Sequence, residues 1–325
     1  MKIIVTGGAG FLGSRVIAAL LARRSETTSV PFDEIVSLDL AECPVQDDRV
    51  VSKVGDIADP AFIASVVDES TSGVFHLAAV LSGGSEENFD LAMKVNIDAT
   101  RELLEACRRS GNGPRFVFTS SLAVFGGPMP DRVPENMATQ PESTYGAFKA
   151  VGELLVNEYS RKGYVDGRIC RLPTISVRPG KPNSAASSFA SGIIREPLNG
   201  IPAPCPVPAA TRMWLSSPDS AVANLVRAFE VDGEAIGAWR VMNLPGISVT
   251  VEQMLASLER VGGAEARALV TDQPEQRVID IVCSWPGDFD VERPVAMGFV
   301  RDTDFDDVVR QYRDEFVAPL EGGRS

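Results

Sequence analysis

The sequence predicts an α/β protein whose main part is a doubly wound parallel sheet, followed by a smaller C-terminal lobe. Short β-branched runs alternate with longer helical patterns over residues 1–172, and a glycine-rich turn follows the first run. Such alternation is typical of parallel sheets covered by helices on both faces. After Pro173 the chain becomes rich in proline, serine and glycine, which favours loops. Because 325 residues exceed most single hydrophobic cores, we expect two lobes.

The elements of the larger lobe are expected in strict alternation along the chain. Strands are expected at 3–6, 35–38, 73–77, 115–119 and 167–173, and helices at 12–23, 61–67, 93–108 and 144–159. The last of these helices is predicted because Ala147, Val151, Leu154 and Leu155 recur at helical spacing. The lobes are expected to divide at residue 172, with about 210–245 contributing again to the larger one. A strand at 239–243 and helices at 251–261 and 305–316 are expected to complete the smaller, substrate-facing lobe.

The charge balance and the cysteines argue against several classes of protein. Acidic residues outnumber basic ones 44 to 31, and a formal charge of −13 repels phosphate backbones, so nucleic-acid binding is not expected. The five cysteines include no C-x-x-C pair, which disfavours a disulfide framework or a zinc site and favours a reducing cytoplasm. The N-terminus does not read as a signal peptide, and no apolar run reaches about 18 residues. We therefore expect no metal, secretion or membrane span.

A glycine-rich turn joins the first expected strand to the first expected helix. Gly7, Gly10 and Gly13 lie at G-x-x-G-x-x-G spacing, with Phe11 and Leu12 at the start of the helix. A pyrophosphate must approach backbone N–H groups at the positive end of a helix, where a Cβ would block it. This context predicts a dinucleotide-binding turn of the Rossmann type. The alternative is a glycine-rich turn that binds no ligand.

An acidic residue, Asp39, ends the second expected strand. A carboxylate there would bond the ribose hydroxyls of an adenosine and repel a 2′-phosphate, which favours NAD over NADP. Its separation from Gly13 is longer than the usual ~20 residues, and an ordinary surface aspartate is the alternative. Asp56 and Ile57 lie between the strands expected at 35–38 and 73–77, and we expect them to lie near the adenine.

Tyr145 and Lys149 lie four residues apart at the start of the helix at 144–159, which places a phenol and an ammonium on one helical face. Free tyrosine has a pKa of about 10, so a base near neutrality needs about three units of depression, or about 4 kcal/mol. A neighbouring ammonium can supply much of this. Such pairs also arise by chance in many helices, but here the pair follows a dinucleotide turn, which favours proton transfer.

Hydroxyl groups end the strand at 115–119. Buried apolar residues lead into Ser120 and Ser121 at the carboxyl edge of the sheet, where ligands usually bind. A serine at this edge can hold the reacting oxygen, and the alternative is that either serine caps a turn. His76 is the only histidine and lies in an apolar run, so we interpret it as a packed strand residue rather than a catalyst.

Together these motifs resemble the extended short-chain dehydrogenase/reductase family, which contains nucleotide-sugar epimerases and dehydratases, over essentially the whole chain. The resemblance implies a catalytic trio of Ser121, Tyr145 and Lys149. In it the tyrosine takes the substrate hydroxyl proton, while the lysine lowers the tyrosine pKa and bonds the nicotinamide ribose. The resemblance also implies NAD as cofactor and a homodimer formed through the helices at 93–108 and 144–159. Further implied cofactor contacts are Leu77, Ala78, Ala79, Asn96 and Pro173.

Some segments narrow the resemblance. Residues 79–84, 173–183 and 195–198 are similar to family members that oxidise the C2 hydroxyl of a four-carbon sugar acid with NAD. Phe125 stands where tyrosine is common, and residues 212–218 replace the usual Arg-Asp-aromatic run, which disfavours a nucleotide-sugar pocket. A sugar acid needs a cation for its carboxylate, and a guanidinium provides a planar bidentate fork. The first candidate is Arg212; the others, each of which could equally be structural, are Ser82, Thr174, Arg178 and Asn183.

Three functions remain in competition. The leading hypothesis is an NAD-dependent dehydrogenase of a small sugar acid. The second is a nucleotide-sugar 4-epimerase or dehydratase that keeps NAD bound and returns the hydride to the same substrate. The third is a protein that binds NAD without turnover, and the presence of Ser121, Tyr145 and Lys149 argues against it.

Overall fold

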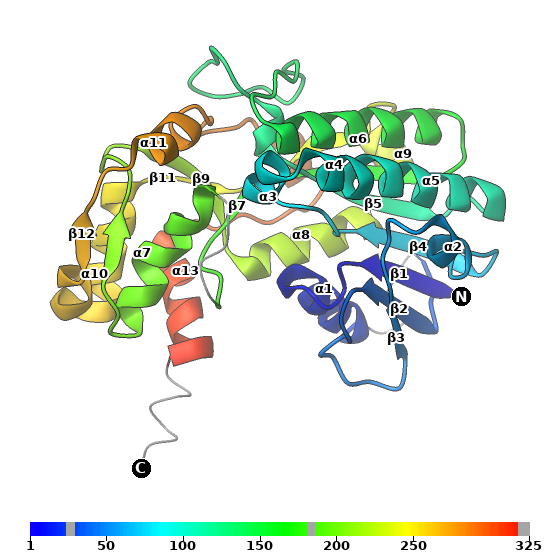
Figure 1. Cartoon of the computed structure of the whole chain (residues 1–325), viewed down its shortest axis with the longest axis horizontal. Coiled ribbons are helices and arrows are strands. Elements are labelled where there is room, and N and C mark those ends of the chain that lie inside the picture. The colour runs from blue at the N-terminus through cyan, green and yellow to red at the C-terminus, as the bar shows by residue number, and fades with distance from the viewer. Residues whose placement is uncertain (24–29, 181–185, 318–325) are drawn as a thin grey trace.

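The computed structural model describes residues 1–23, 30–180 and 186–317, and these form two adjoining lobes (Figure 1). The larger lobe is built on a seven-stranded parallel sheet with the strand order β3-β2-β1-β4-β5-β6-β10. The strand order reverses between β1 and β4, and open α/β sheets bind ligands outside the carboxyl ends of the strands at this reversal. The predicted doubly wound fold is confirmed.

The strands of the large sheet are buried on both faces. Ile3, Ile4 and Val5 of β1 are consecutive and all 0% exposed, as expected where helices cover both faces of a parallel sheet. The strands are β1 (Lys2–Thr6), β2 (Glu34–Asp39), β3 (Val50–Val54), β4 (Thr71–His76), β5 (Arg115–Ser121), β6 (Asp166–Leu172) and β10 (Val241–Asn243).

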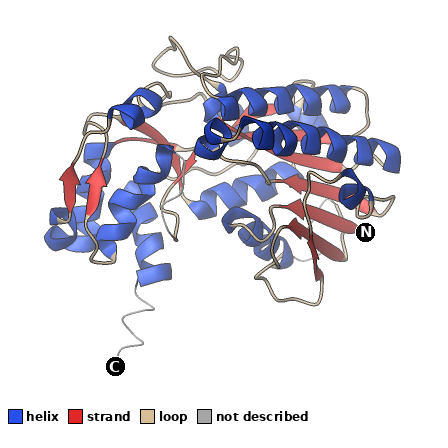
Figure 2. Cartoon of the chain, viewed as in Figure 1, coloured by secondary structure: helices blue, strands red, loops and turns tan. Residues whose placement is uncertain are grey.

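Helices cover the two faces of this sheet (Figure 2). On one face α1 and α8 pack with Ile3 and Phe75 in a common core, and on the other α5 and α6 pack with Ile4 and Val74. The helices and helical turns of this lobe are α1 (Phe11–Leu21), α2 (Pro60–Ala64), α3 (Ser82–Glu87), α4 (Phe89–Ala92), η1 (Met93–Asp98), α5 (Ala99–Ser110), η2 (Leu122–Val124), α6 (Thr144–Arg161), α8 (Pro218–Glu230) and α9 (Gly233–Ile236).

The smaller lobe has its own apolar core, in which Ile193, Leu255 and Val309 are buried. Two small sheets run in the orders β11-β9-β7 and β12-β8. The elements of this lobe are β7 (Thr174–Ile175), η3 (Ala186–Ser188), α7 (Phe189–Leu198), β8 (Ala203–Cys205), β9 (Arg212–Ser216), β11 (Ile247–Thr250), α10 (Val251–Ala268), β12 (Val270–Asp272), α11 (Gln276–Val282), α12 (Glu292–Ala296), α13 (Phe305–Tyr312) and η4 (Arg313–Val317).

Two expected elements differ from the structure. The strand at 239–243 was expected both to complete the smaller lobe and, as part of 210–245, to contribute to the larger one. The first expectation is wrong, because β10 pairs with β6 at the edge of the large sheet. Its residues Val241 and Met242 are 0% exposed, and burial on both faces is available to them only beside β6. The helix at 93–108 begins as the π-helical segment η1 before continuing as α5. No helix in the three described ranges is long and apolar enough to span a bilayer.

Candidate active site

The glycine-rich turn between β1 and α1 leaves room for a phosphate. A Cβ on Gly13 would lie 2.0 Å from the Gly7 carbonyl oxygen, and Gly7 has a φ of 72°, which side chains rarely adopt. α1 begins at Phe11 and has no acidic residue in its first turn, so nothing there competes for the positive end of the helix. These residues fit the pyrophosphate of a dinucleotide.

Asp39 lies where the sequence expects the carboxylate that binds ribose. It ends β2, and its Oδ2 accepts a hydrogen bond of 3.0 Å from the Ala9 backbone inside the glycine-rich turn. Asp56 instead accepts a hydrogen bond from the Ala58 backbone at 2.8 Å, and Ile57 is buried in the core. Asp39 therefore lies beside the phosphate turn, whereas Asp56 caps a turn after β3.

The segment after β4 faces the same turn. A Cβ added to Gly7 would meet the Ala78 backbone nitrogen at 3.0 Å, so the two backbones are in direct contact. Asn96 of η1 accepts a hydrogen bond from the Val80 N–H at 2.8 Å and donates one to the Val80 carbonyl at 3.0 Å. Asn96 thus positions the chain that runs on from Leu77.

The catalytic trio predicted by the sequence comes together at the start of α6. Ser143 caps this helix by accepting a hydrogen bond from the Gly146 N–H. A Cβ on Gly146 would lie 2.0 Å from the Ala123 carbonyl oxygen, so α6 packs directly on the segment after Ser121. As a result the Ser121 hydroxyl lies close enough to the Tyr145 phenol to lower its pKa. Ser121 also accepts a hydrogen bond from the Ala123 N–H at 3.2 Å, so it caps a turn as well.

The pKa of Tyr145 differs from the sequence expectation. Burial raises it to about 12, while the hydrogen bond from Ser121 and the positive charge of Arg178 act in the lowering direction. The sequence expects Lys149 to depress this pKa toward neutrality. In the chain alone the pKa of Tyr145 lies above its ordinary value, because desolvation disfavours the phenolate more than the surrounding groups stabilise it.

Lys149 is buried beneath Tyr145. It is 4% exposed, and its Nζ donates a hydrogen bond of 2.6 Å to the Thr119 carbonyl and lies 5.6 Å from the centre of the Tyr145 ring. Burial lowers the pKa of Lys149 to about 7, and the negative charge of Glu153 acts in the opposite direction. The lysine is therefore poised to change its charge near neutral pH.

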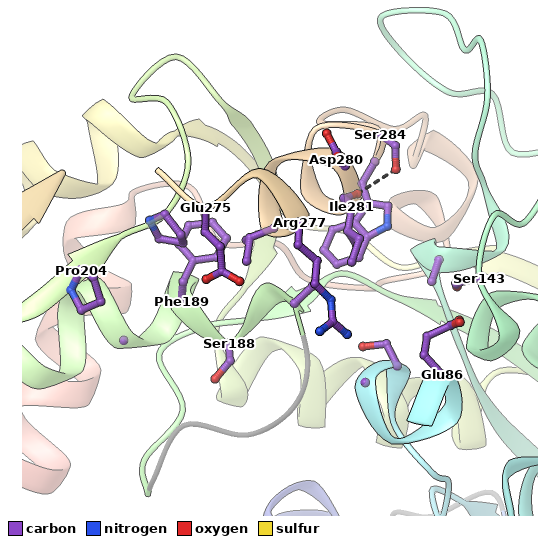
Figure 3. Close-up of a pocket in the computed structure, with 18 of the residues that line it drawn as sticks. Glu86, Ser143, Ser188, Phe189, Pro204, Glu275, Arg277, Asp280, Ile281 and Ser284 are labelled. Atoms are coloured by element: carbon purple, nitrogen blue, oxygen red, sulfur yellow. Dashed lines mark hydrogen bonds between the residues drawn. The ribbon is translucent and has the colours of Figure 1, made fainter. Parts of the chain in front are cut away.

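A cavity of about 870 Å³ is lined by residues of both lobes (Figure 3). Ala123 and Ser143 line it from the larger lobe, close in sequence to Ser121 and Tyr145. In Figure 3 the Arg277 side chain extends from α11 into this space. Arg277 is the only cation among the described lining residues, which also include the carboxylates of Glu86, Glu87, Glu142, Glu196, Glu275 and Asp280.

Known proteins resemble this chain in sequence and in fold. A model of the NAD dependent epimerase/dehydratase family matches residues 3–236. The chain belongs to this family. The D-erythronate dehydrogenase of Cupriavidus necator is 51% identical over 319 residues, which are 97% of this chain and 98% of that protein. That of Haemophilus influenzae is 43% identical over 314 residues, covering 96% of this chain and 98% of the relative.

A solved structure gives the same result for the fold. The crystal structure of the nucleoside-diphosphate-sugar epimerase from Agrobacterium tumefaciens matches with a TM-score of 0.91 and 36% identity, covering 98% of this chain and 95% of that one. This member of the NAD-dependent epimerase/dehydratase family is therefore an enzyme that uses NAD, as its motifs predict.

The predicted substrate contacts are dispersed. Ser82 lines the cavity at the start of α3, and Thr174 lies on β7 immediately after the buried Pro173. Arg178 is close enough to Tyr145 for its charge to act on the phenol. Arg212 does not line the cavity; it is exposed at the start of β9 and packs against Gly287. Asn183 lies outside the described residues.

A buried ion pair beneath the trio escaped the sequence analysis. Glu153 accepts hydrogen bonds from Arg171 Nε at 2.8 Å and Nη2 at 2.7 Å, and from the Ser120 hydroxyl at 2.6 Å. Both charged side chains are 3% exposed. Glu153 lies one turn beyond Lys149, so its charge favours the ammonium. A carboxylate eight residues after Tyr145, on the buried face of the helix, was the signal that could have found it.

His76 is structural, as the sequence indicates. It is 1% exposed, and its two ring nitrogens lie 2.7 Å from the Thr6 hydroxyl and 2.8 Å from the Thr100 hydroxyl. Burial and the nearby charge of Lys149 lower its pKa to about 3. The histidine is therefore neutral and held on both sides. In the described part of the chain no group of three His, Cys, Asp or Glu side chains could hold a metal ion.

Proposed function

We propose that this enzyme is an NAD-dependent D-erythronate dehydrogenase, which oxidises the C2 hydroxyl of the sugar acid to a 2-oxo-tetronate. One observation carries the proposal: the chain is 51% identical to the Cupriavidus necator D-erythronate dehydrogenase over 97% of its length. Its cavity is lined by Ala123 and Ser143, each two residues from Ser121 or Tyr145 along the chain. The altered residues 212–218, which disfavour a nucleotide-sugar pocket, support it further.

In this proposal the three side chains divide the work on the C2 hydroxyl. The Ser121 hydroxyl, which lies close enough to Tyr145 to act on its pKa, orients the substrate oxygen, and the Tyr145 phenolate takes its proton. Bound NAD⁺ supplies the acceptor for the C2 hydride and a positive charge, so that the products are the 2-oxo acid, NADH and one proton. General-base catalysis of this kind contributes about 10²–10⁴-fold to a rate.

The cofactor contacts follow the glycine-rich turn and the sheet edge. The turn would hold the pyrophosphate, Asp39 the adenosine ribose, and Lys149 the nicotinamide ribose. Because the pKa of Tyr145 is about 12 in the chain alone, the phenolate needs added positive charge, from protonated Lys149 and from the bound cofactor. The remaining proposed contacts are Gly7, Gly10, Phe11, Leu12, Gly13, Asp56, Ile57, Leu77, Ala78, Ala79, Asn96 and Pro173.

The cavity offers partners for the hydroxyls of a sugar acid. Ser82 and Ser143 lie on its inner wall, and the carboxylates of Glu86 and Glu142 can accept hydrogen bonds from a polyol. Thr174 is proposed as a further polyol contact from β7. Arg212 is not retained as the carboxylate ligand, because its side chain is exposed outside the cavity.

A second candidate function is favoured by the 36% identity to the Agrobacterium tumefaciens nucleoside-diphosphate-sugar epimerase structure. A nucleotide-sugar 4-epimerase or dehydratase would use the same trio but return the hydride to its substrate. Purified protein would then carry tightly bound NAD and convert UDP-sugars without accumulating NADH.

The test is to incubate the purified enzyme with NAD and a panel of four- to six-carbon sugar acids, with NADP as control. We expect NADH absorbance with D-erythronate and much less activity with NADP. No NADH from any sugar acid, together with turnover of a UDP-sugar, would replace the proposal by the second candidate.

We also propose that the enzyme is a cytoplasmic homodimer. Apolar side chains on α4 and α6 face solvent in the single chain: Phe89 is 53%, Leu91 46%, Val151 41% and Leu154 62% exposed. Burial of such a surface against a second copy would remove it from water. The free thiols at Cys43, Cys107, Cys170, Cys205 and Cys283 support a reducing compartment. Light scattering of the purified protein tests the dimer.

A further inference from the structure

Arg178, whose charge acts on Tyr145, has a half-buried guanidinium with no anion beside it among the described residues. Arg178 lies in the loop between β7 and α7, and its backbone is held on both sides. Its N–H donates to the Ser191 hydroxyl at 3.1 Å, and its carbonyl accepts a hydrogen bond of 2.9 Å from Arg195. These two hydrogen bonds hold the Arg178 backbone against α7, so the position from which its side chain extends is fixed.

The side chain itself is unsatisfied. Within the described ranges the Arg178 guanidinium forms no hydrogen bond and no ion pair, and its Nε is fully buried without a partner. The nearby charge of Arg195 is of the same sign, and the Arg195 guanidinium has its own carboxylate, that of Glu196, at 2.5 Å. The Arg178 residue is half-buried, and desolvation without a counter-ion disfavours its charge, so this position is suited to an anion that arrives with the substrate.

Arg178 is also the arginine whose charge acts on Tyr145, where it opposes the effect of burial on the phenol. Arg277 instead lies on α11 and lines the outer cavity. An anion bound at Arg178 therefore lies close to the group that takes the proton.

We propose that Arg178 binds the carboxylate of a 2-hydroxy acid and thereby selects the hydroxyl next to the carboxylate for oxidation; this rests on the proposed sugar-acid dehydrogenase activity. In such an acid C2 is bonded directly to the carboxylate carbon. A carboxylate anchored beside Tyr145 brings the C2 hydroxyl to the phenol and leaves the C3 and C4 hydroxyls further from it. The planar fork of arginine fits both carboxylate oxygens, which a lysine ammonium does not.

The experiment compares D-erythronate with its neutral amide, D-erythronamide, in the wild type and in Arg178→Met. The amide keeps every hydroxyl but has no negative charge. In the wild type we expect kcat/KM to be about 10- to 150-fold higher for the acid than for the amide, since a charged hydrogen-bonded pair contributes about 1.5–3 kcal/mol. In Arg178→Met we expect the KM for the acid to rise about 100-fold and this preference to disappear. Arg178→Lys should recover only part of it.

Folding is checked separately, and two further arginines serve as comparisons. Arg178→Met removes an uncompensated buried charge, so its melting temperature should equal or exceed that of the wild type. Arg277→Met tests the competing cation, and Arg301→Met is a matched control, an exposed arginine of the same lobe that does not line the cavity. Both should keep the acid-over-amide preference within about threefold.

The outcomes distinguish failure of the Arg178 assignment from failure of the proposed dehydrogenase activity. If Arg178→Met keeps both its KM for D-erythronate and the preference for the acid, or if Arg277→Met loses them instead, the assignment of Arg178 is overturned while the dehydrogenase activity stands. If the wild type produces no NADH from any sugar acid, the proposed function fails and the assignment of Arg178 fails with it.

Discussion

The two lobes contribute to the site in different ways. In the larger lobe, one strand, one turn and one helix form the phosphate site, because backbone groups and missing Cβ atoms at Gly7 and Gly13 define it. In the smaller lobe, Arg178 follows β7, Phe189 begins α7 and Arg277 lies on α11, a spread of about a hundred residues. Local spacing specifies the first kind of site, whereas only tertiary packing specifies the second.

The largest effect on activity is expected for a substitution in the larger lobe, at Tyr145. Tyr145→Phe removes the hydroxyl that takes the proton and leaves the ring in place. We expect the rate of NADH formation with D-erythronate to fall about 10³-fold, within the range known for general-base catalysis, while the melting temperature stays the same. A rate within tenfold of the wild type would show that another group carries the proton.

The next effect breaks the phosphate turn. In Gly13→Ala the new Cβ would lie 2.0 Å from the Gly7 carbonyl oxygen, so the turn must move. We expect the dissociation constant for NAD, measured by calorimetry, to rise at least about 100-fold. Gly192→Ala is the control in the smaller lobe, because its Cβ would meet only Glu196 at 3.7 Å. Equal affinities in the two variants would argue against this turn as the NAD site.

The charge of Lys149 predicts a pH-dependent stability. Its pKa is lowered from 10.5 to about 7 in the folded protein, so between these values the unfolded chain binds more protons than the native state. The free energy of unfolding of the wild type therefore rises with pH across this window, by at most about 1.4 kcal/mol per pH unit, and below pH 7 the full penalty of burying the ammonium is present.

Lys149→Met tests this relation. The variant lacks the titrating group, so we expect it to be more stable than the wild type at pH 7 and the difference to shrink as the pH rises toward 10. Urea denaturation at several pH values measures it, and the same variant should lose most of its activity. A difference that does not change with pH would contradict a buried, titrating lysine.

The smallest effect on substrate binding is expected at Arg212, the arginine that the sequence favours as the carboxylate ligand. Arg212 is exposed and packs on Gly287 outside the cavity. We expect Arg212→Met to change the KM for D-erythronate by less than about threefold, in contrast to the loss expected for Arg178→Met. Steady-state kinetics of the two variants side by side would sharpen or reverse the distinction between them.

These cases show what the sequence could predict. The doubly wound fold follows from the periodicity of the sequence. Asp39 was predicted from its place after the second strand, and the trio and Asn96 from the resemblance to the family. Glu153 and Arg171 were missed, because their pairing needs the contact between α6 and β6. The choice between Arg178 and Arg212 was also out of reach, since both lie beside short strands of one small sheet and only folding shows that Arg212 is exposed while Arg178 is half-buried.

The pKa of Tyr145 could not be predicted for a related reason. Spacing places Lys149 one turn away, which suggests a stabilised phenolate. Burial of both groups outweighs that proximity in the chain alone, raising the pKa of the tyrosine and lowering that of the lysine. Desolvation depends on the packing of β5 and α6 around the pair, which no local pattern contains.

The central claim is net oxidation of a sugar acid, and a single assay tests it most directly. Purified enzyme is mixed with NAD and D-erythronate, and NADH absorbance is followed while the 2-oxo acid is trapped and quantified. We expect one NADH for each 2-oxo acid formed. Substrate conversion without NADH, or no turnover of any sugar acid beside conversion of a UDP-sugar, would contradict it.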